Sequence, residues 1–371
     1  MRKLVLAGLF VVGLVWAIAN FSGLAAQGTY DSIVLDFRED IDAAQIERQV
    51  QTIAQKYNVR PRLNSEFSQA DHLYTVKGDK NLLNALKHDL KQYTEYIEPD
   101  YIYSIPESQD SKVTVPSKEA QPIQATGQAP NDPLYSQQWN LHSINVESSW
   151  QDTKGKGTTV AVIDTGIAEV PDLKETKFAK GYDFVNDRED ARDDNGHGTH
   201  VAGTIAQSTN NGFGVAGIAY EATLMPLKVL SASGGGTVAD IAEAIRFAAD
   251  HNADVINMSL GGGGESSAMA EAIDYAHKKG VLIIAAAGNS GQSSASYPAR
   301  YPHVLGVGAL DSSGQKAAYS NFGAGVDISA PGGLISGDNT AGGILQNTID
   351  PSTGEFPFVA FQGTSMAAPH V

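Results

Sequence analysis

Three short segments of the chain carry residue types that together could perform nucleophilic catalysis. They hold an aspartate, a histidine and a serine in that order: Asp164 in Val160–Gly166, His197 in Asn195–Gly203 and Ser365 in Gly363–Val371. A serine hydroxyl at neutral pH needs an imidazole to take its proton, and the imidazole needs a carboxylate to fix its tautomer and stabilise its charged form. The sequence therefore predicts an acyl-transfer site in which Ser365 is the nucleophile, His197 the base and Asp164 the orienting carboxylate.

Each segment taken alone has a simpler interpretation. An aspartate after an apolar run is common in α/β proteins, because strands of parallel sheets often end in polar loops. His197 and His200 have a spacing that could suit a metal, but no third ligand lies nearby in the sequence. The segment around Ser365 has Ala367 where the nucleophile elbow of α/β-hydrolases has glycine. The agreement of three segments in one order is what indicates catalysis.

The order Asp, His, Ser distinguishes the subtilisin arrangement from those of chymotrypsin and the α/β-hydrolases. From about residue 131 to residue 371 the segments resemble those of the subtilisin-like serine proteases. The resemblance implies a secreted serine endopeptidase that hydrolyses peptide bonds of proteins through an Asp-His-Ser triad and an acyl-enzyme intermediate. It also implies that the enzyme is made as a zymogen that processes itself.

A fourth catalytic group is implied at the end of the apolar run Val281–Ser290, where the resemblance assigns Asn289 as a donor to the oxyanion. The chemistry of this role is general, because negative charge develops on the carbonyl oxygen in the tetrahedral state. An amide donor fixed beforehand stabilises that charge by roughly 3 to 4 kcal/mol. The alternative is that Asn289 is a simple turn residue after a strand.

The resemblance places the substrate between the segments 259–262 and 231–236. The residues expected to contact it are Ser259, Leu260, Gly261, Ser231 and Gly234. An extended peptide can bind there as an added strand, and glycine lets its backbone come close. Residues 290–297 would line the primary specificity pocket, and this loop has no acidic residue. We therefore expect a broad preference for apolar and aromatic side chains rather than for Lys or Arg.

Calcium is the structural ion that the resemblance implies. The loop Ser208–Val215 resembles the calcium loop of the family, with Asn211 as its side-chain ligand and Asp132 and Asp172 as outlying carboxylate ligands. Oxygen donors of this kind suit a hard cation.

The same loop also fits a Gly-x-Gly-x-x-Gly pattern at Gly212, Gly214 and Gly217, which leaves a nucleotide-binding protein as an alternative. The pattern is weak evidence, because it follows an expected helix instead of opening one after a strand. No ribose-binding acid is evident.

Composition limits the partners of the chain. It has 371 residues, a net charge of −16 and no cysteine, so neither disulfides nor a cysteine-ligated structural zinc can stabilise it. Residues 131–371 contain 13 Lys and Arg against 26 Asp and Glu, a net charge of −13. This acidic balance argues against nucleic acid as a partner. We expect protein or peptide substrates and a monomer.

The beginning of the chain is predicted to be a secretory signal peptide, residues 1–26. The basic start Met1–Lys3 precedes the apolar block Leu4–Ala19, and small residues follow at Ala25 and Ala26. The block is shorter than the roughly 20 residues that span a bilayer, which favours cleavage over a retained anchor. Contact with the membrane is expected only during translocation.

Residues 29–105 are predicted to form a small unit of their own. The expected elements are a strand at 32–38, a helix at 43–57, a strand at 73–76, a helix at 81–93 and a strand at 96–104. This order suits a ferredoxin-like α+β fold and resembles the prodomain of subtilisin-like proteases. The resemblance implies an intramolecular inhibitor and folding template whose tail, residues 98–103, lies in the active-site cleft. The alternative is an unrelated accessory domain.

Residues 106–130 are predicted to be a linker, because they are rich in Pro, Gln, Ser and Lys and show little periodicity. The processing site is expected between residues 104 and 131.

Residues 131–371 are predicted to be the peptidase domain, an α/β unit with a three-layer subtilisin-like fold and a mainly parallel sheet. Buried strands are expected at 158–163, 224–229, 253–258, 281–286 and 303–308, with helices at 238–251 and 267–279. Chemistry in such folds lies at the carboxyl ends of the strands. Asp164 and Asn289 stand at expected strand ends, and His197 and Ser365 open expected helices.

The sequence ends six residues after Ser365, whereas the family continues beyond its nucleophile. The C-terminal part of the domain is therefore expected to be missing, and residues 1–371 alone are expected to be poorly active. The segment 332–357 is longer than in compact members of the family, and its role is left open. A catalytically silent, peptide-binding subtilisin fold remains the alternative to an active enzyme.

Overall fold

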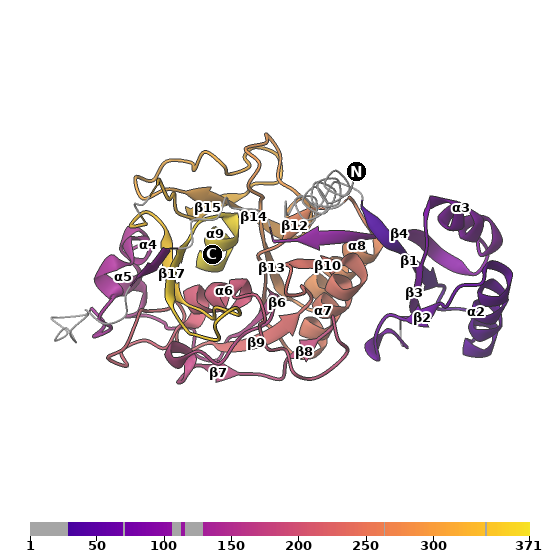
Figure 1. The fold of residues 1–371 in the computed structure, drawn as a ribbon, viewed down its shortest axis with the longest axis horizontal. Helices are drawn as coiled ribbons and strands as arrows, with labels where there is room; N and C mark the ends of the chain where they lie inside the picture. The colour runs from indigo at the N-terminus through magenta and orange to yellow at the C-terminus, as the bar shows by residue number, and fades with distance from the viewer. Residues whose placement is uncertain (1–28, 70, 106–112, 116–128, 263, 338–339) are drawn as a thin grey trace, which may run out of the picture.

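The computed structural model describes residues 29–371 except 70, 106–112, 116–128, 263 and 338–339 (Figure 1). The predicted signal peptide and most of the predicted linker, where processing is expected, lie outside the described residues. Two units are evident: the N-terminal unit, residues 29–105, and the C-terminal unit, residues 131–371. The expected order of elements is confirmed in both, with an α+β arrangement in the N-terminal unit and an α/β arrangement in the C-terminal unit.

The N-terminal unit is an antiparallel sheet with two helices packed against it. Its elements are β1 (Tyr30–Phe37), α2 (Ala43–Tyr57), β2 (Arg62–Leu63), β3 (Leu73–Lys77), α3 (Lys80–Asp89) and β4 (Thr94–Ser104). The strand order is β4-β1-β3-β2. Ile46 and Ile53 of α2 and Leu86 of α3 are buried against Ile33 and Leu35 of β1. The alternation of apolar residues in β1 thus supplies the face that the helices cover.

The predicted extent of the second helix was wrong at its C-terminal end. α3 ends at Asp89, not at Tyr93. Leu90 accepts hydrogen bonds from the backbone N–H groups of Tyr93 and Thr94, and Thr94 is already the first residue of β4. The apolar residues near Tyr93 pack on the same core as those of α3, so the helical spacing continues past the end of the helix. Periodicity alone therefore could not locate the turn between Leu90 and Thr94.

The C-terminal unit is built on an eight-stranded sheet whose pairs are all parallel. Its strands are β6 (Thr159–Asp164), β7 (Lys177–Phe178), β8 (Tyr182–Asp183), β9 (Thr223–Lys228), β11 (Val255–Met258), β13 (Leu282–Ala286), β14 (Val304–Leu310) and β15 (Ile328–Pro331). The order is β15-β14-β13-β11-β6-β9-β7, with β8 also on β9. The five predicted strands are therefore confirmed.

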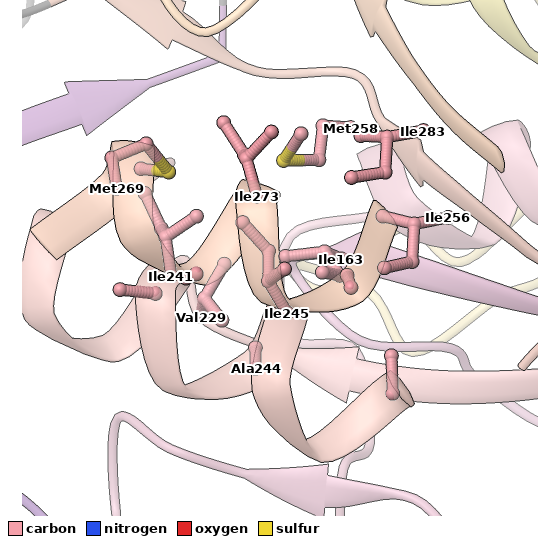
Figure 2. Packing of buried hydrophobic residues seen from close by; sticks show 14 of the residues in the cluster. Ile163, Val229, Ile241, Ala244, Ile245, Ile256, Met258, Met269, Ile273 and Ile283 are labelled. Atoms are coloured by element: carbon pink, nitrogen blue, oxygen red, sulfur yellow. The ribbon is translucent and has the colours of Figure 1, made fainter. Parts of the chain in front are cut away.

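Helices cover both faces of this sheet, as the three-layer prediction requires. They are α6 (His197–Ala206), α7 (Val238–Asp250), α8 (Ser267–Lys278) and α9 (Thr364–Ala367). Along β6, Ala161 and Ile163 belong to the core that includes α7 and α8, whereas Val160 and Val162 belong to the core with α6. Figure 2 shows Ile163 among the buried side chains of the first core. Burial on both faces explains why these strands are continuous apolar runs.

The remaining elements are short. They are α4 (Trp139–Ser143), α5 (Val146–Ser149), β5 (Val113–Val115), β10 (Gly235–Thr237), β12 (Gly261–Gly262), β16 (Ile344–Asn347), β17 (Phe358–Phe361) and four single turns of 3-10 helix, Phe67–Gln69, Tyr135–Gln137, Pro171–Leu173 and Ala368–His370. The segment 332–357, whose role the sequence left open, contains β16. This strand pairs antiparallel with β17, which also pairs with β5. None of the helices formed by the described residues has the length and apolar character needed to cross a membrane.

Replacing Ile163 by alanine tests the central core. Ile163 is fully buried between β6 and α7, so Ile163→Ala should lower the free energy of unfolding by about 2 to 5 kcal/mol. Ile328→Ala, in the edge strand β15 where the side chain is 45% exposed, is the matched control and should cost much less. Denaturant unfolding of both variants checks this. Equal losses in the two would contradict the described packing.

Candidate active site

Asp164 and His197 meet at the carboxyl end of the sheet. Asp164 is the last residue of β6 and is fully buried, and His197 is the first residue of α6. The distance between His197 Nδ1 and Asp164 Oδ1 is 2.8 Å, and the Thr165 N–H donates to the same oxygen. A proton on Nδ1 suits this contact, because the carboxylate can only accept. Nε2, the other ring nitrogen, is then left as the basic one.

The position of His197 depends on Asp193, which the sequence analysis did not single out. Asp193 Oδ1 accepts hydrogen bonds from the N–H groups of Asn195 and Gly196, and Oδ2 accepts from the N–H and hydroxyl of Thr199. These bonds fix the loop that enters α6 and satisfy amides at its start, which have no partner within the helix. Burial raises the pKa of the Asp193 carboxyl. An acidic residue just before a helix start was the available signal.

Lys228 is a second residue that the sequence analysis missed. It is the last residue of β9 and is fully buried, and its Nζ donates to Thr165 O, Leu230 O and Asp194 Oδ1. One ammonium group therefore ties the ends of β6 and β9 to the loop that carries His197. A lysine inside an otherwise apolar strand was the signal, since such residues are rarely buried without a specific partner.

Ser365 lies in α9, one residue from its start, and is held against the end of β11. Its Oγ donates to Ser259 O at 3.1 Å, and Ser259 Oγ donates to Ser365 O at 2.8 Å. His197 Nε2 is buried and accepts no hydrogen bond from the described residues. In this structure the hydroxyl of Ser365 therefore bonds to Ser259 O and not to His197 Nε2. Hydrogen bonds between catalytic groups are often absent or long before substrate is bound.

Asn289 is held beside the nucleophile by Thr364. Its Oδ1 accepts from the N–H of Thr364 at 2.9 Å and from the hydroxyl of the same residue at 2.8 Å. Its Nδ2 lies 3.1 Å from where a Cβ on Gly363 would be, and Gly363 has a φ of +148°. A side chain at Gly363 would therefore crowd the amide and strain the backbone. This arrangement fixes an amide donor next to Ser365, which is the geometry that the predicted oxyanion role requires.

The two predicted substrate segments enclose the tail of the N-terminal unit. β4 lies between β10 and β12 as an antiparallel strand, with Tyr103 opposite both Gly236 and Gly262 (Figure 1). Beyond the strand, the Ile105 N–H donates to Gly234 O at 3.0 Å. These main-chain contacts are those that an extended peptide would make.

The predicted contact residues occupy this cleft in different ways. Gly261 pairs with Ser104 through the backbone, and Gly234 bonds to Ile105. Ser259 and Leu260 are fully buried, and Ser259 bonds to Ser365 through its hydroxyl and its carbonyl oxygen. Ser231 bonds to Gly235 O through its N–H and its hydroxyl and so shapes the turn before β10.

Two carboxylates of β4 bind the first turns of the helices under the N-terminal unit. Asp100 Oδ1 accepts from the Ala239 N–H of α7, and Oδ2 accepts from the Ser32 hydroxyl. Glu98 accepts from the N–H groups of Ser267 and Ala268 and from the Ser266 hydroxyl at α8. Negative charge at these helix starts is favourable, because their amides are unpaired and the helix dipole is positive there.

The loop after Asn289 lines an open pocket of 430 Å³, as expected of residues 290–297. Its described lining residues are Gly262, Gly264, Ser290, Gln292, Ser294, Ala295, Ser296, Tyr297, Arg300 and Asn321. The charged side chain in this set is Arg300, and no carboxylate is present among them. The small side chains leave room for a bulky group. This lining agrees with the expectation against Lys or Arg, but the side-chain preference itself stays a prediction.

Asp132, Asp172 and Asn211 come together around the loop that follows α6. Asp132 accepts from the N–H groups of Asn210 and Asn211, and Asp172 accepts from Val215 N–H and Asn211 Nδ2. Both carboxylates are fully buried. Burial, with the nearby charge of Asp132, raises the pKa of Asp172 to about 7. Two buried acids close enough for the charge of one to act on the other favour a bound cation, so the residues present fit a calcium ion.

The glycine pattern at Gly212, Gly214 and Gly217 belongs to this same loop. A Cβ on Gly214 would lie 2.1 Å from Asp172 Oδ2, so glycine lets the backbone wrap the carboxylate. The pattern follows α6 and does not open a helix after a strand. It therefore lacks the structural setting of a dinucleotide site.

Comparison with known proteins gives a consistent result. The model of the subtilase family matches residues 155–371. The thermophilic serine proteinase of Bacillus sp. (strain AK1) is 34% identical over 358 residues, covering 95% of this chain and 78% of that protein. Thermitase of Thermoactinomyces vulgaris is 39% identical over 244 residues, covering 65% and 82%. The crystal structure of fervidolysin from Fervidobacterium pennivorans, a keratinolytic enzyme related to subtilisin, superposes with a TM-score of 0.74 at 29% identity. It covers 93% of this chain and 54% of that one.

Removing the ammonium group of Lys228 should destabilise the C-terminal unit. Lys228→Met leaves two buried carbonyl oxygens, those of Thr165 and Leu230, without their donor, at about 1 to 3 kcal/mol each. Thermal unfolding should therefore occur at a clearly lower temperature. Lys174→Met, at an exposed position, is the matched control and should leave the unfolding temperature nearly unchanged. A similar unfolding temperature for both variants would show that Lys228 does not hold the two strand ends.

Proposed function

Because the chain belongs to the subtilase family and is a serine-type peptidase, a hydrolase, we propose that Asp164, His197 and Ser365 are its catalytic triad. The observation that carries the proposal is the 2.8 Å contact between His197 Nδ1 and Asp164 Oδ1. A buried carboxylate that accepts from Nδ1–H leaves Nε2 as the base, and Nε2 is the buried ring nitrogen without a partner among the described residues. This is the nitrogen that has to accept the serine proton.

In the proposed mechanism Ser365 Oγ attacks the carbonyl carbon of the scissile peptide bond as its proton passes to His197 Nε2. Asp164 stabilises the imidazolium that forms. Asn289 Nδ2 donates to the oxygen on which negative charge develops. His197 then gives its proton to the departing amine, leaving an acyl-enzyme on Ser365, and a water activated by the same imidazole hydrolyses this ester. The substrates are proteins or peptides, held as a strand between β10 and β12.

The N-terminal unit is proposed to be an intramolecular inhibitor that is removed by self-processing. Its support is the pairing of Tyr103 and Ser104 with both β10 and β12, since these residues occupy the strand position that a substrate needs. Processing between residues 104 and 131 would free the tail. Secretion is proposed from the basic and apolar pattern of residues 1–26, with the active enzyme outside the cell as a monomer.

One observation favours a second candidate, a silent peptide-binding protein of the same fold. The hydroxyl of Ser365 bonds to Ser259 O and makes no bond to His197 in this structure. A protein that keeps this arrangement with a peptide in the cleft would bind and not hydrolyse. A fluorophosphonate probe separates the two candidates, because it labels a serine only when the adjacent imidazole activates it.

Calcium is proposed as a structural ion held by Asp132, Asp172 and Asn211. Bound there, a divalent cation supplies the positive charge that two facing, buried carboxylates otherwise lack. The ion would tie the loop after α6 to the segment before β6 and to Asp172. No disulfide can take over this function, since the chain has no cysteine.

Self-processing tests the catalytic proposal. The full-length precursor, expressed with calcium and followed by intact mass spectrometry, should lose its N-terminal unit by cleavage between residues 104 and 131. Ser365→Ala should stay intact, and Asp164→Asn should process on the order of 10⁴ times more slowly because the imidazole loses its orienting carboxylate. Cleavage of Ser365→Ala at the same position would show that Ser365 is not the nucleophile.

The pH dependence of stability tests the calcium proposal. In the folded protein without an ion, burial raises the pKa of Asp172 to about 7, whereas in the unfolded chain the carboxyl ionises near its ordinary value of about 4, so stability is lost between these two values. With a chelator present, the unfolding temperature should therefore fall as the pH rises from about 4 to about 7 and then level off, and added calcium should restore it mainly at the upper end of this range and above. Asp172→Asn should remove both effects. If calcium does not change the unfolding temperature above this range, the proposed site is refuted.

A further inference from the structure

A small cavity lies in the interface between the N-terminal unit and the helices α7 and α8. The N-terminal unit contributes Asp36 of β1 and Glu95 and Tyr96 of β4 to its lining, and the helices contribute Glu243, Arg246 and Glu271. Apolar contacts beside it, among Val34, Leu73 and Ala239, bring the two surfaces together. This interface is separate from the cleft that holds residues 102–105.

Three carboxylates from the two units meet in this cavity. Ligand oxygens of Asp36, Glu95 and Glu271 all lie within 4.8 Å of one another. Asp36 is only 8% exposed, Glu271 is half-buried and Glu95 is exposed. Like charges at such distances repel, and burial of one of them weakens the screening by water. Docking therefore brings the carboxyl of Glu271 against those of Asp36 and Glu95, which share the N-terminal sheet, and this contact is unfavourable if all three are ionised.

The charged groups around the cluster do not compensate for it. Among the described residues that line the cavity, Arg246 is the one cation, and the remaining charged groups are carboxylates: Asp36, Glu39, Asp71, Glu95, Glu243 and Glu271. Arg246 forms an ion pair with Asp71 at 3.5 Å, and its guanidinium lies over the ring of Tyr275. Glu98, further along β4, adds negative charge that acts on Glu271.

Glu243 is a second buried carboxyl at this interface whose surroundings disfavour its ionised form. Its side chain is 3% exposed, and Oε2 accepts from Asn64 Nδ2 of the N-terminal unit at 2.8 Å. Its other oxygen, Oε1, is buried without a hydrogen-bond partner among the described residues. Asn64 Nδ2 also donates to Asp240, so one amide serves two acids across the interface. A buried carboxylate oxygen without a donor is costly when ionised and far less so when protonated.

We propose that docking of the N-terminal unit is linked to proton uptake: this carboxyl cluster binds protons when the two units meet and releases them, together with the unit, as the pH rises. The proposal rests on the proposed role of residues 29–105 as an inhibitor and adds its regulation. The ligand is the proton, shared among Asp36 and Glu95 of the N-terminal unit and Glu271 of α8, which only the docked state brings to them.

The direction of the effect follows from the pKa values of the docked state. Burial, with the charges of Glu271 and Glu95, raises the pKa of Asp36 to about 8, although Arg246 opposes the shift. Burial likewise raises the pKa of Glu243 to about 8 and the pKa of Glu271. Once the units separate, these carboxyls meet water and return toward ordinary values near 4. Docking is therefore strongest at acidic pH and weakens as the pH rises toward 8.

The size of the effect is set by the number of protons taken up. Each carboxyl that is protonated when docked and ionised when free weakens docking by up to tenfold per pH unit over that range. With Asp36 and Glu243 both contributing, the loss between about pH 5.5 and pH 8 should exceed tenfold, even if the repulsion is partly relieved by local movement.

Hydrogen exchange of the full chain carrying Ser365→Ala measures docking without self-cleavage. The reporting amides are those paired across the interface: Ile105 in the cleft, Ala239 at α7 and Ser267 and Ala268 at α8. After correction for the intrinsic pH dependence of exchange, their protection should fall more than tenfold between about pH 5.5 and pH 8. Amides of β13, far from the interface in the central sheet, should keep theirs.

Neutral variants of the cluster separate the proposal from a general effect of pH. Glu271→Gln and Glu95→Gln keep the shape of the side chains and remove charge, so each should flatten the pH dependence and raise protection at about pH 8. Glu169→Gln, an exposed carboxyl outside the cluster, is the matched control and should behave as the parent. Glu95 is exposed and Glu271 is half-buried, so each can be substituted without unfolding the chain.

Two results would overturn the proposal directly: protection that rises with pH, or the same pH dependence in all variants. A third result would also overturn it: at alkaline pH, added calcium restores protection in the parent but not in Glu271→Gln. The last would show that a metal ion, and not a proton, neutralises the cluster. None of them bears on the peptidase activity itself, which is tested with Ser365 in place and could fail or succeed independently.

Discussion

The site depends on one constraint, the parallel arrangement of a sheet that is covered on both faces. Parallel strands deliver their carboxyl ends to one edge, so β6, β9, β11 and β13 bring Asp164, Lys228, Ser259 and Asn289 to the same place. The helices that follow then begin at this edge, which is where His197 and Ser365 stand. Asp164 and Ser365 are 201 positions apart along the chain, yet both lie at this edge, Asp164 against His197 and Ser365 against the end of β11.

Much of this arrangement could be predicted from the sequence, because the signals are local. Strands buried on both faces are continuous apolar runs, and Ala253–Met258 or Val281–Ala286 could be recognised without any partner strand. The three segments that hold Asp164, His197 and Ser365 were recognisable from short motifs. The end of α3 was misplaced, however, because residues after Asp89 continue to face the core while the backbone leaves the helix.

What could not be predicted involves contacts between distant segments. In the sequence, Lys228 looks like an ordinary strand residue. Its role is visible only in the structure, where its ammonium group donates to Thr165 O and Asp194. The hydrogen bond of Ser365 to Ser259 O depends on a rotamer, which no motif specifies. The cluster of Asp36, Glu95 and Glu271 forms only when the two units are docked. In the sequence, each of these residues looks like an ordinary solvent-exposed acid on a strand or helix.

The placement of titratable groups in the two contact regions has a consequence for the proposed inhibition. The tail in the cleft is held by main-chain hydrogen bonds between Tyr103 or Ser104 and the glycine-rich strands, and amides and carbonyls do not titrate near neutral pH. A substrate would use the same bonds, so the cleft cannot distinguish the tail from a substrate by pH. Sensitivity to pH without loss of substrate binding therefore has to lie outside the cleft. The interface of the N-terminal unit with α7 and α8 meets that condition, because its carboxyls touch no bond that a substrate needs.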